Sequence, residues 1–173
     1  MILIIDLNSE EMGFDEFVLP VARIVGKDYE IQHYTEIKNP NKYEKIILCG
    51  TPLKDHQALQ GEFFNWMDEY EGKILGICAG MQVLCLQYGA ELIDCVEIGM
   101  KKVKVKIDNL LYHKDFEAYG LHTFAIHPSE NFEVLFESET CVEGVKLMGT
   151  DFYGVLFHPE VRNKQILENF LKI

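Results

Sequence analysis

The sequence predicts an α/β fold with three layers, in which helices flank a mostly parallel central sheet and additional antiparallel strands follow in the second half. Two observations support this. In the first half, short apolar runs typical of buried parallel strands alternate with segments of helical spacing. In the second half, several strand-like segments follow one another without a helix between them. No repeat or linker divides the chain, so we expect a single domain over residues 1–173.

The first half of the chain should contain alternating strands and helices. The expected strands are Ile2–Asp6, Tyr29–Tyr34, Lys45–Cys49 and Lys73–Ile77. The expected helices are Phe14–Val25, Glu62–Tyr70 and Ala79–Tyr88. Pro20 should kink the first helix or begin a new turn, because proline has no N–H to donate inside a helix. Gly26 and Gly89 should end the helices that precede them.

The second half should be richer in strands. Residues 101–107 alternate between lysine and apolar side chains, which is typical of an antiparallel strand with one face in water. We expect these lysines to form a solvated face rather than an anion site. The other expected strands are His122–Ile126, Phe132–Glu137, Cys141–Leu147 and Phe152–Phe157, and the expected closing helix is Lys164–Ile173.

The composition excludes several classes of partner. The chain has 28 acidic and 16 basic residues, so its net charge of −12 argues against nucleic acid or an anionic membrane. No apolar run approaches the roughly 20 residues that a membrane span requires. The five cysteines are odd in number and lack metal-ligand spacing, so we expect no metal and a reduced, cytoplasmic location. We also find no motif for a cofactor.

The first chemical motif is a cysteine at a strand-to-helix junction. Cys78 follows an apolar strand, precedes a helix, and has Gly76 and Gly80 two residues to either side. This spacing is typical of a nucleophile elbow, a sharp turn that projects a reactive side chain above the sheet edge. The helix that begins after Cys78 would favour its thiolate form. The alternative is a small buried cysteine after a core strand.

The second motif supplies a base and an acid. His158 ends an apolar strand, Pro159 turns the chain out of the sheet, and Glu160 is close enough in sequence to contact the same imidazole. A carboxylate that holds one ring nitrogen protonated would leave the other to face a thiol, as in a Cys-His-acid triad. Alone, His158 would more simply be a polar strand-end residue facing water.

Together these motifs resemble the class I glutamine amidotransferases, which have a flavodoxin-like fold. The resemblance rests on Gly76–Gln82 and Phe157–Glu160, and the order of motifs matches along nearly the whole chain. It implies hydrolysis of glutamine to glutamate and ammonia, with Cys78 as nucleophile, His158 as general base and acid, and Glu160 orienting the imidazole. It also implies that the ammonia passes to a synthase partner.

Further residues can be assigned around this triad. The N–H of Ala79, at the start of the helix, is a candidate oxyanion donor. By the resemblance, Thr51 supplies the second donor and Gly50 belongs to the same substrate loop. The resemblance also assigns Gln82 and His122 to the glutamine site. A surface glutamine and a satisfied strand histidine are the respective alternatives.

Within the family, the chain resembles the separate glutaminase subunit of archaeal-type GMP synthases. The likeness lies in Ser138–Lys146, Tyr153–Val161 and Ile166–Phe170. It implies a separate ATP-dependent synthase subunit of the ATP-pyrophosphatase type, since this chain contains no ATP-binding loop.

Some residues depart from the family pattern. Thr51 replaces a glycine of the usual Ser-Gly-Gly-Pro loop, and a positive φ there would strain a β-branched residue. Leu156 and Phe124 replace a customary glutamine and aspartate. Two other functions therefore remain open: a stand-alone γ-glutamyl hydrolase, and a catalytically weak or regulatory amidotransferase-like binding protein.

Overall fold

The computed structural model describes residues 1–173 as one nine-stranded sheet with helices on both faces. The strands are β1 (Ile2–Asp6), β2 (Tyr29–His33), β3 (Lys45–Leu48), β4 (Lys73–Ile77), β5 (Glu91–Val105), β6 (Phe116–His127), β7 (Phe132–Glu137), β8 (Val142–Leu147) and β9 (Phe152–Val155). The α-helices are α1 (Glu11–Gly13), α2 (Leu19–Val25), α3 (Ala79–Gln87) and α4 (Lys164–Phe170). The shorter turns include a π-helical turn, Phe14–Val18, and a 3₁₀ turn, Asn65–Glu69.

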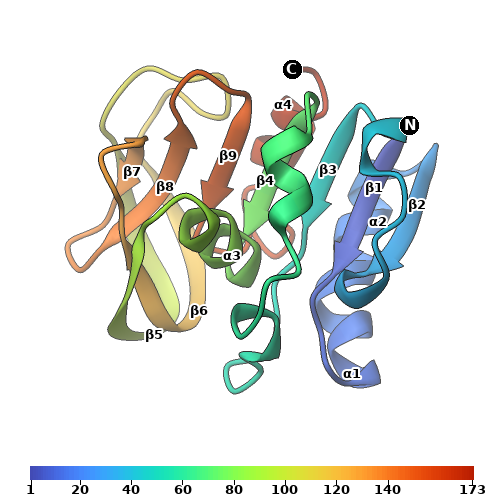
Figure 1. Ribbon diagram of the computed structural model, residues 1–173. Helices are drawn as coiled ribbons and strands as arrows, with labels where there is room; N and C mark the ends of the chain where they lie inside the picture. The colour runs from blue at the N-terminus through green and yellow to red at the C-terminus, as the bar shows by residue number, and fades with distance from the viewer.

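The strand order is β2-β1-β3-β4-β9-β8-β7-β5-β6. In this order, the strands from β2 to β9 pair in parallel, and the pairings from β9 to β6 are antiparallel. This confirms the predicted mixed sheet. Figure 1 shows β1, β3, β4 and β9 pointing the same way, so that their carboxyl ends share the lower edge of the sheet. The loops that follow these strands therefore meet at this edge.

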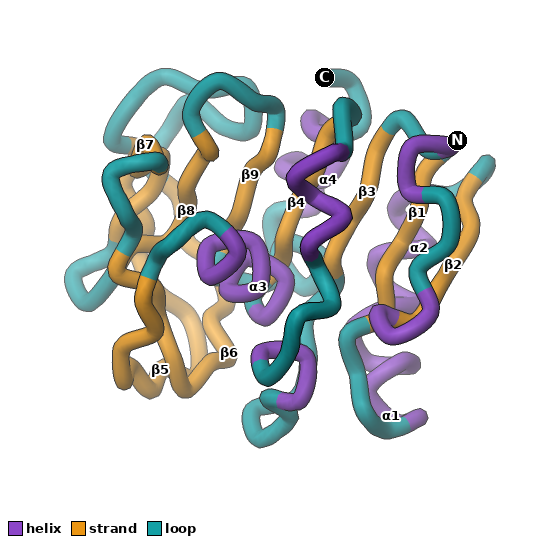
Figure 2. Tube along the Cα trace, in the orientation of Figure 1, coloured by secondary structure: helices purple, strands orange, loops and turns teal.

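The layers follow from alternation along the strands. On β1, Leu3 and Ile5 face the core cluster beneath α3, whereas Ile4 faces the cluster beneath α2 and α4. The helices thus cover opposite faces of the sheet (Figure 2). Burial on both faces explains why the parallel strands are almost continuously apolar.

The helix predicted at Glu62–Tyr70 is wrong. The segment forms only the 3₁₀ turn, and its buried side chains are Phe64, Met67 and Tyr70. These lie three residues apart, which matches the 3.0 residues per turn of a 3₁₀ helix rather than the 3.6 of an α-helix. The apolar content of the segment was therefore a sign of burial and not of helix type.

Pro20 begins a new helical segment, which was one of the two predicted outcomes. It lies in the first turn of α2, directly after the π-helical turn. The Leu19 N–H still donates to the Phe14 carbonyl five residues back, and the regular hydrogen-bond pattern is interrupted in this turn, next to the proline that has no N–H to donate.

The β5–β6 ribbon is longer than predicted. Both strands bend at the lower edge in Figure 1, and Gly99, with φ 123°, pairs with Gly120. Lys102 and Lys104 are exposed as expected, but the side chain of Lys101 is only 10% exposed and forms ion pairs. The prediction of a wholly solvated lysine face is therefore wrong at Lys101. Among the helices, none is long and apolar enough to cross a membrane.

We expect Gly80→Ala to lower the free energy of unfolding by about 3 kcal/mol, because the added Cβ would collide with the backbone carbonyl of Leu48. Gly149→Ala is the control, since its Cβ would meet no atom and only its φ of 77° opposes alanine, at a cost of about 1 kcal/mol. Urea unfolding of both variants measures the difference. Equal losses would mean that the close approach of α3 to β3 is not rigid.

Candidate active site

Cys78 lies at the turn between β4 and α3, with φ 49° and ψ −105°. A positive φ is unfavourable for any residue with a Cβ and is common at functional turns. The Cys78 N–H donates to the Val155 carbonyl at 2.8 Å, which ties the turn to β9. The Sγ is almost fully buried and donates to the Leu121 carbonyl on β6 at 3.5 Å.

The two flanking glycines are required by close backbone approach, as predicted. A Cβ on Gly76 would collide with the backbone of Gly80. A Cβ on Gly80 would collide in turn with Leu48 on β3. The elbow is therefore packed directly against the sheet, which limits the motion of the Cys78 backbone.

His158 and Glu160 lie just past the end of β9, beside the elbow. The His158 N–H donates to the Tyr119 carbonyl at 2.9 Å, and Nδ1 lies 2.7 Å from Glu160 Oε1. Because a carboxylate accepts hydrogen bonds, this contact assigns the proton to Nδ1. Nε2 is buried without any hydrogen-bond partner. The alternative of a strand-end histidine facing water is wrong, since His158 is 1% exposed.

The electrostatics of His158 depend on both neighbours. Burial disfavours the imidazolium, but the charges of Cys78 and Glu160 outweigh this effect and raise the pKa of His158 well above its ordinary value. The imidazole thus has an acid on one side and a thiol close to the other. The arrangement stabilises a proton on the ring when the thiol is ionised.

Two backbone donors lie near the thiol. Thr51, Cys78 and Ala79 line the same pocket. The Thr51 N–H donates to no other group of the protein, and Ala79 is the first residue of α3, where an N–H has no intrahelical acceptor. Thr51 does not adopt a positive φ, so the strain considered above does not occur. Its Oγ1 instead donates to the Asp55 carbonyl at 2.9 Å and closes the loop on itself.

The pocket at Cys78 is small, with a cavity volume of about 10 Å³. That is about the space of one water molecule. Its other lining residues are Pro52, Leu53, His56, Gln82, Leu121, His122 and Thr123. The pocket is shallow and open to solvent, so it encloses little of a glutamine side chain.

Three residues assigned to substrate lie in different surroundings. Gln82 lines the pocket and is buried, not on the surface, and its Nε2 donates to the Phe124 carbonyl at 2.8 Å. His122 has both ring nitrogens engaged away from the pocket, which favours the satisfied strand histidine. Gly50 is not among the lining residues and packs against the His158 ring. Their substrate roles remain predictions.

Of the β6 residues that line the pocket, sequence reasoning named His122 and missed its two neighbours, Leu121 and Thr123. Leu121 accepts the Cys78 hydrogen bond, and Thr123 contacts His56 Nε2 at 3.4 Å. His56 also packs edge-on against Phe124, with ring centroids 5.0 Å apart. No motif identifies these residues, because their position depends on the curvature of the β5–β6 ribbon.

Comparison with known proteins places this geometry in a family context. Residues 11–173 match the family model described as "Glutamine amidotransferase class-I". A glutamine-hydrolyzing GMP synthase subunit from Methanocaldococcus jannaschii is 38% identical, over 80% of this chain and 78% of its own length. The corresponding protein of Methanococcus aeolicus is also 38% identical, over the same shares of the two chains.

Solved structures show the same fold. A Thermoplasma acidophilum protein superposes with a TM-score of 0.83 and 23% identity, over 99% of this chain and 92% of its own. A glutamine amidotransferase from Thermotoga maritima gives a TM-score of 0.73 and 19% identity, over 99% of this chain and 80% of its own.

We expect Cys78→Ala to lower the pKa of His158, because it removes the neighbouring charge that raises this pKa most. Glu160→Gln should lower it too. Histidine NMR titration of the parent and both variants measures the shifts. An unchanged pKa in the Cys78→Ala protein would show that the thiol and the imidazole do not interact.

Proposed function

Because the chain belongs to the class I glutamine amidotransferase family, we propose that it is the glutaminase subunit of a two-subunit GMP synthase. It hydrolyses glutamine to glutamate and ammonia and hands the ammonia to a separate ATP-dependent synthase. The observation that supports this proposal is the contact of His158 with Glu160, together with the influence of Cys78 on the pKa of His158 and the buried, unpartnered Nε2. A buried nitrogen without a partner costs stability and calls for an explanation, and a role in proton transfer supplies one.

The first half of the reaction is acyl transfer to sulfur. The Cys78 thiol gives its proton to His158 Nε2, and the thiolate attacks the side-chain amide carbon of glutamine. The tetrahedral oxyanion is stabilised by the N–H groups of Ala79 and Thr51, an effect typically worth about 3 kcal/mol per donor. His158 then protonates the departing amine, so that ammonia leaves and a thioester remains.

The second half is hydrolysis of the thioester. His158, now neutral, takes a proton from water as the water attacks the acyl carbon. A second oxyanion forms in the same place and collapses, which releases glutamate and restores the thiol. Glu160 holds Nδ1 protonated throughout, so Nε2 is always the nitrogen that exchanges protons with sulfur, ammonia and water.

The shallow pocket supports low activity in the isolated protein. Its cavity volume is only about 10 Å³, so its walls enclose little of a glutamine side chain. Docking of the synthase would complete the walls of the site, and glutamine hydrolysis would then be coupled to the presence of an acceptor.

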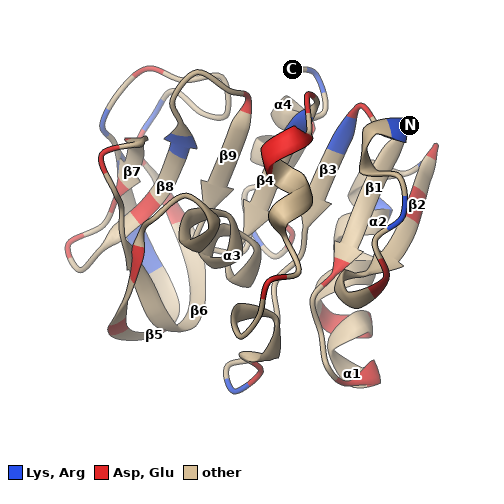
Figure 3. Cartoon of the chain, in the orientation of Figure 1, with Lys and Arg blue, Asp and Glu red and all other residues tan.

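An apolar surface beside the pocket supports a protein partner. Val96, Ile98 and Met100 on β5 are 71%, 65% and 50% exposed. Ile98 pairs with Leu121, which lines the Cys78 pocket. Exposed apolar groups at neighbouring strand positions mark interaction sites. Acidic side chains of the α1 region lie along the same lower edge of the sheet, but on the side of β1 and away from β5 (Figure 3).

The two alternatives differ in their need for a partner. A γ-glutamyl hydrolase would act alone, and a regulatory binding protein would hydrolyse glutamine under no condition. Glutaminase assays with and without a candidate synthase separate all three functions. The single nine-stranded sheet supports one catalytic domain.

The five cysteines are all free. Because a thiol nucleophile must stay reduced, this supports a location in the cytoplasm.

We expect Cys78→Ala to lower glutamine-dependent activity by about 10³-fold or more, because the nucleophile is lost. Use of free ammonia by the synthase should be unchanged. His158→Ala should behave similarly, and Glu160→Gln more mildly. Steady-state assays with either nitrogen source measure these effects.

Cys85→Ala is the control for this series, since Cys85 lies on the same helix but is buried in the core. It should retain activity. Release of ammonia from glutamine by the Cys78→Ala protein would contradict the assignment of the nucleophile.

We expect Ile98→Glu to weaken stimulation by the synthase about tenfold, because a charge would be buried at the contact. Its activity without the synthase should not change. Leu110→Glu is the control: Leu110 is 58% exposed, but it lies in the β5–β6 connection at the opposite edge of the sheet (Figure 1). Titration of each variant with the synthase measures the effect, and equal stimulation of both would place the partner elsewhere.

A further inference from the structure

A second polar cluster lies behind the β6 wall of the catalytic pocket. Glu97 on β5, His122 on β6 and Cys141 and Glu143 at β8 place four donor atoms within 4.8 Å of one another. We call these four residues the β5–β8 cluster. None of them serves in the reaction described above, and Glu143 is completely buried.

Three distances between the donors are close to the edges of a tetrahedron. His122 Nε2 lies 3.1 Å from Glu97 Oε2, and Cys141 Sγ lies 3.7 Å from Glu97 Oε2 and 3.4 Å from Glu143 Oε1. A zinc ion bound to nitrogen and oxygen at about 2.0 Å and to sulfur at about 2.3 Å gives edges of about 3.3–3.5 Å. These three edges therefore fit one ion without large movement.

The surrounding hydrogen bonds orient the donors as in known metal centres. His122 Nδ1 lies 2.9 Å from the Cys95 carbonyl, which can only accept, so Nδ1 carries the proton and Nε2 offers its lone pair to the cluster. Thr140 Oγ1 donates to the other Glu97 oxygen at 2.6 Å. Ligating histidines and carboxylates are held by contacts of this kind.

The cluster contains one cation and two carboxylates. The Lys101 ammonium lies 2.5 Å from Glu97 Oε2, 2.5 Å from Glu143 Oε1 and 3.1 Å from His122 Nε2. It thus occupies the centre where an ion would bind. Even so, Glu143 Oε2 is buried with no partner, and one positive charge does not balance two negative ones. A buried carboxylate oxygen without a partner is costly, and coordination of a metal ion is one way to satisfy it.

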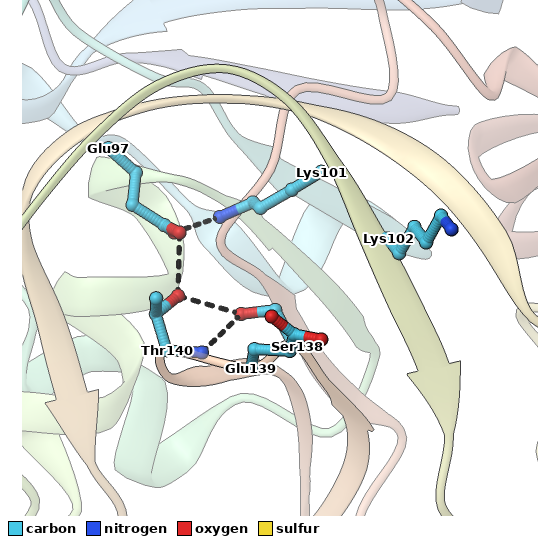
Figure 4. A pocket seen from close by; sticks show the side chains of 6 residues that line it. All are labelled: Glu97, Lys101, Lys102, Ser138, Glu139 and Thr140. Atoms are coloured by element: carbon cyan, nitrogen blue, oxygen red, sulfur yellow. Dashed lines mark hydrogen bonds and ion pairs between the residues drawn. The ribbon is translucent and has the colours of Figure 1, made fainter.

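The Lys101 side chain lies next to a space into which it could rotate. A polar cleft with a cavity volume of about 370 Å³ opens beside it (Figure 4). The cleft is lined by Glu97, Lys101, Lys102, Ser138, Glu139 and Thr140. Rotation of the lysine side chain into this cleft would expose its charge to water and free the centre of the cluster.

We propose that the β5–β8 cluster is a binding site for a divalent ion of the zinc class, which displaces the Lys101 ammonium into the cleft. Imidazole, thiolate and carboxylate donors in tetrahedral geometry suit Zn²⁺ and Co²⁺ and not Mg²⁺ or Ca²⁺. On binding, Cys141 loses its thiol proton to solvent. The ion joins β5, β6 and β8 and so holds His122, which lies between the pocket residues Leu121 and Thr123. The proposal does not depend on glutaminase activity.

The site departs from the expectation that the chain holds no metal. That expectation rested on ligand spacing along the sequence, whereas these donors come from separate strands. The four donors come together only when β5, β6 and β8 are folded against one another.

Titration with Co²⁺ tests the proposal, with every protein carrying Cys78→Ala so that the catalytic thiol cannot bind the probe. We expect a thiolate-to-cobalt charge-transfer band and the visible bands of tetrahedral Co²⁺ at one equivalent. Lys101→Met removes the competing ammonium and should tighten binding about tenfold or more. Cys141→Ser should abolish the charge-transfer band, and Glu143→Gln should weaken binding.

Cys95→Ser is the matched control, because Cys95 is a half-exposed neighbour whose carbonyl contacts His122 but whose thiol is not one of the four donors. It should keep the band. Circular dichroism and thermal unfolding establish that each variant is folded. Absence of the band in the Lys101→Met protein, or its survival in the Cys141→Ser protein, would overturn the proposal.

Discussion

The parallel pairing of β4 with β9 is the constraint on which the active site depends. It sets Ile77 opposite Val155, so Cys78 and His158 both leave the sheet at the same edge although many residues separate them in the chain. The hydrogen bond from the Cys78 N–H to the Val155 carbonyl continues this register one residue past the end of β4. A slip of one residue would turn every side chain of β9 to the other face and remove the imidazole from the thiol.

The strand β6 separates two buried polar groups of opposite character. On one side, His158 lies between a thiol and a carboxylate and keeps one nitrogen free. On the other, Lys101 contacts one oxygen of each of two carboxylates and the His122 nitrogen at once. Both groups are shielded from water, so each charge depends strongly on its neighbours. Strand β6 joins the two groups, because it supplies Leu121 and Thr123 to the Cys78 pocket and His122 to the β5–β8 cluster.

Local patterns were sufficient for most of the fold and for the contact between His158 and Glu160. Apolar runs predicted the parallel strands, and glycine spacing predicted the turn at Cys78, because both depend on neighbours in sequence. Prediction failed at Glu62–Tyr70, where burial with a period of three produced a 3₁₀ turn. It also failed at Lys101, whose strand pattern is that of a solvated face. In both cases the outcome depended on contacts with distant strands.

By itself, the sequence determined the order of strands and helices, the elbow at Cys78 and the pairing of His158 with Glu160, since each depends on residues within a few positions of one another. Only the tertiary structure decided what surrounds them. Residues from segments that are far apart in the chain come together in the Cys78 pocket, with its β6 wall, and in the β5–β8 cluster. The physical reason is that strand order and sheet curvature arise from packing of the whole core, which no local pattern records.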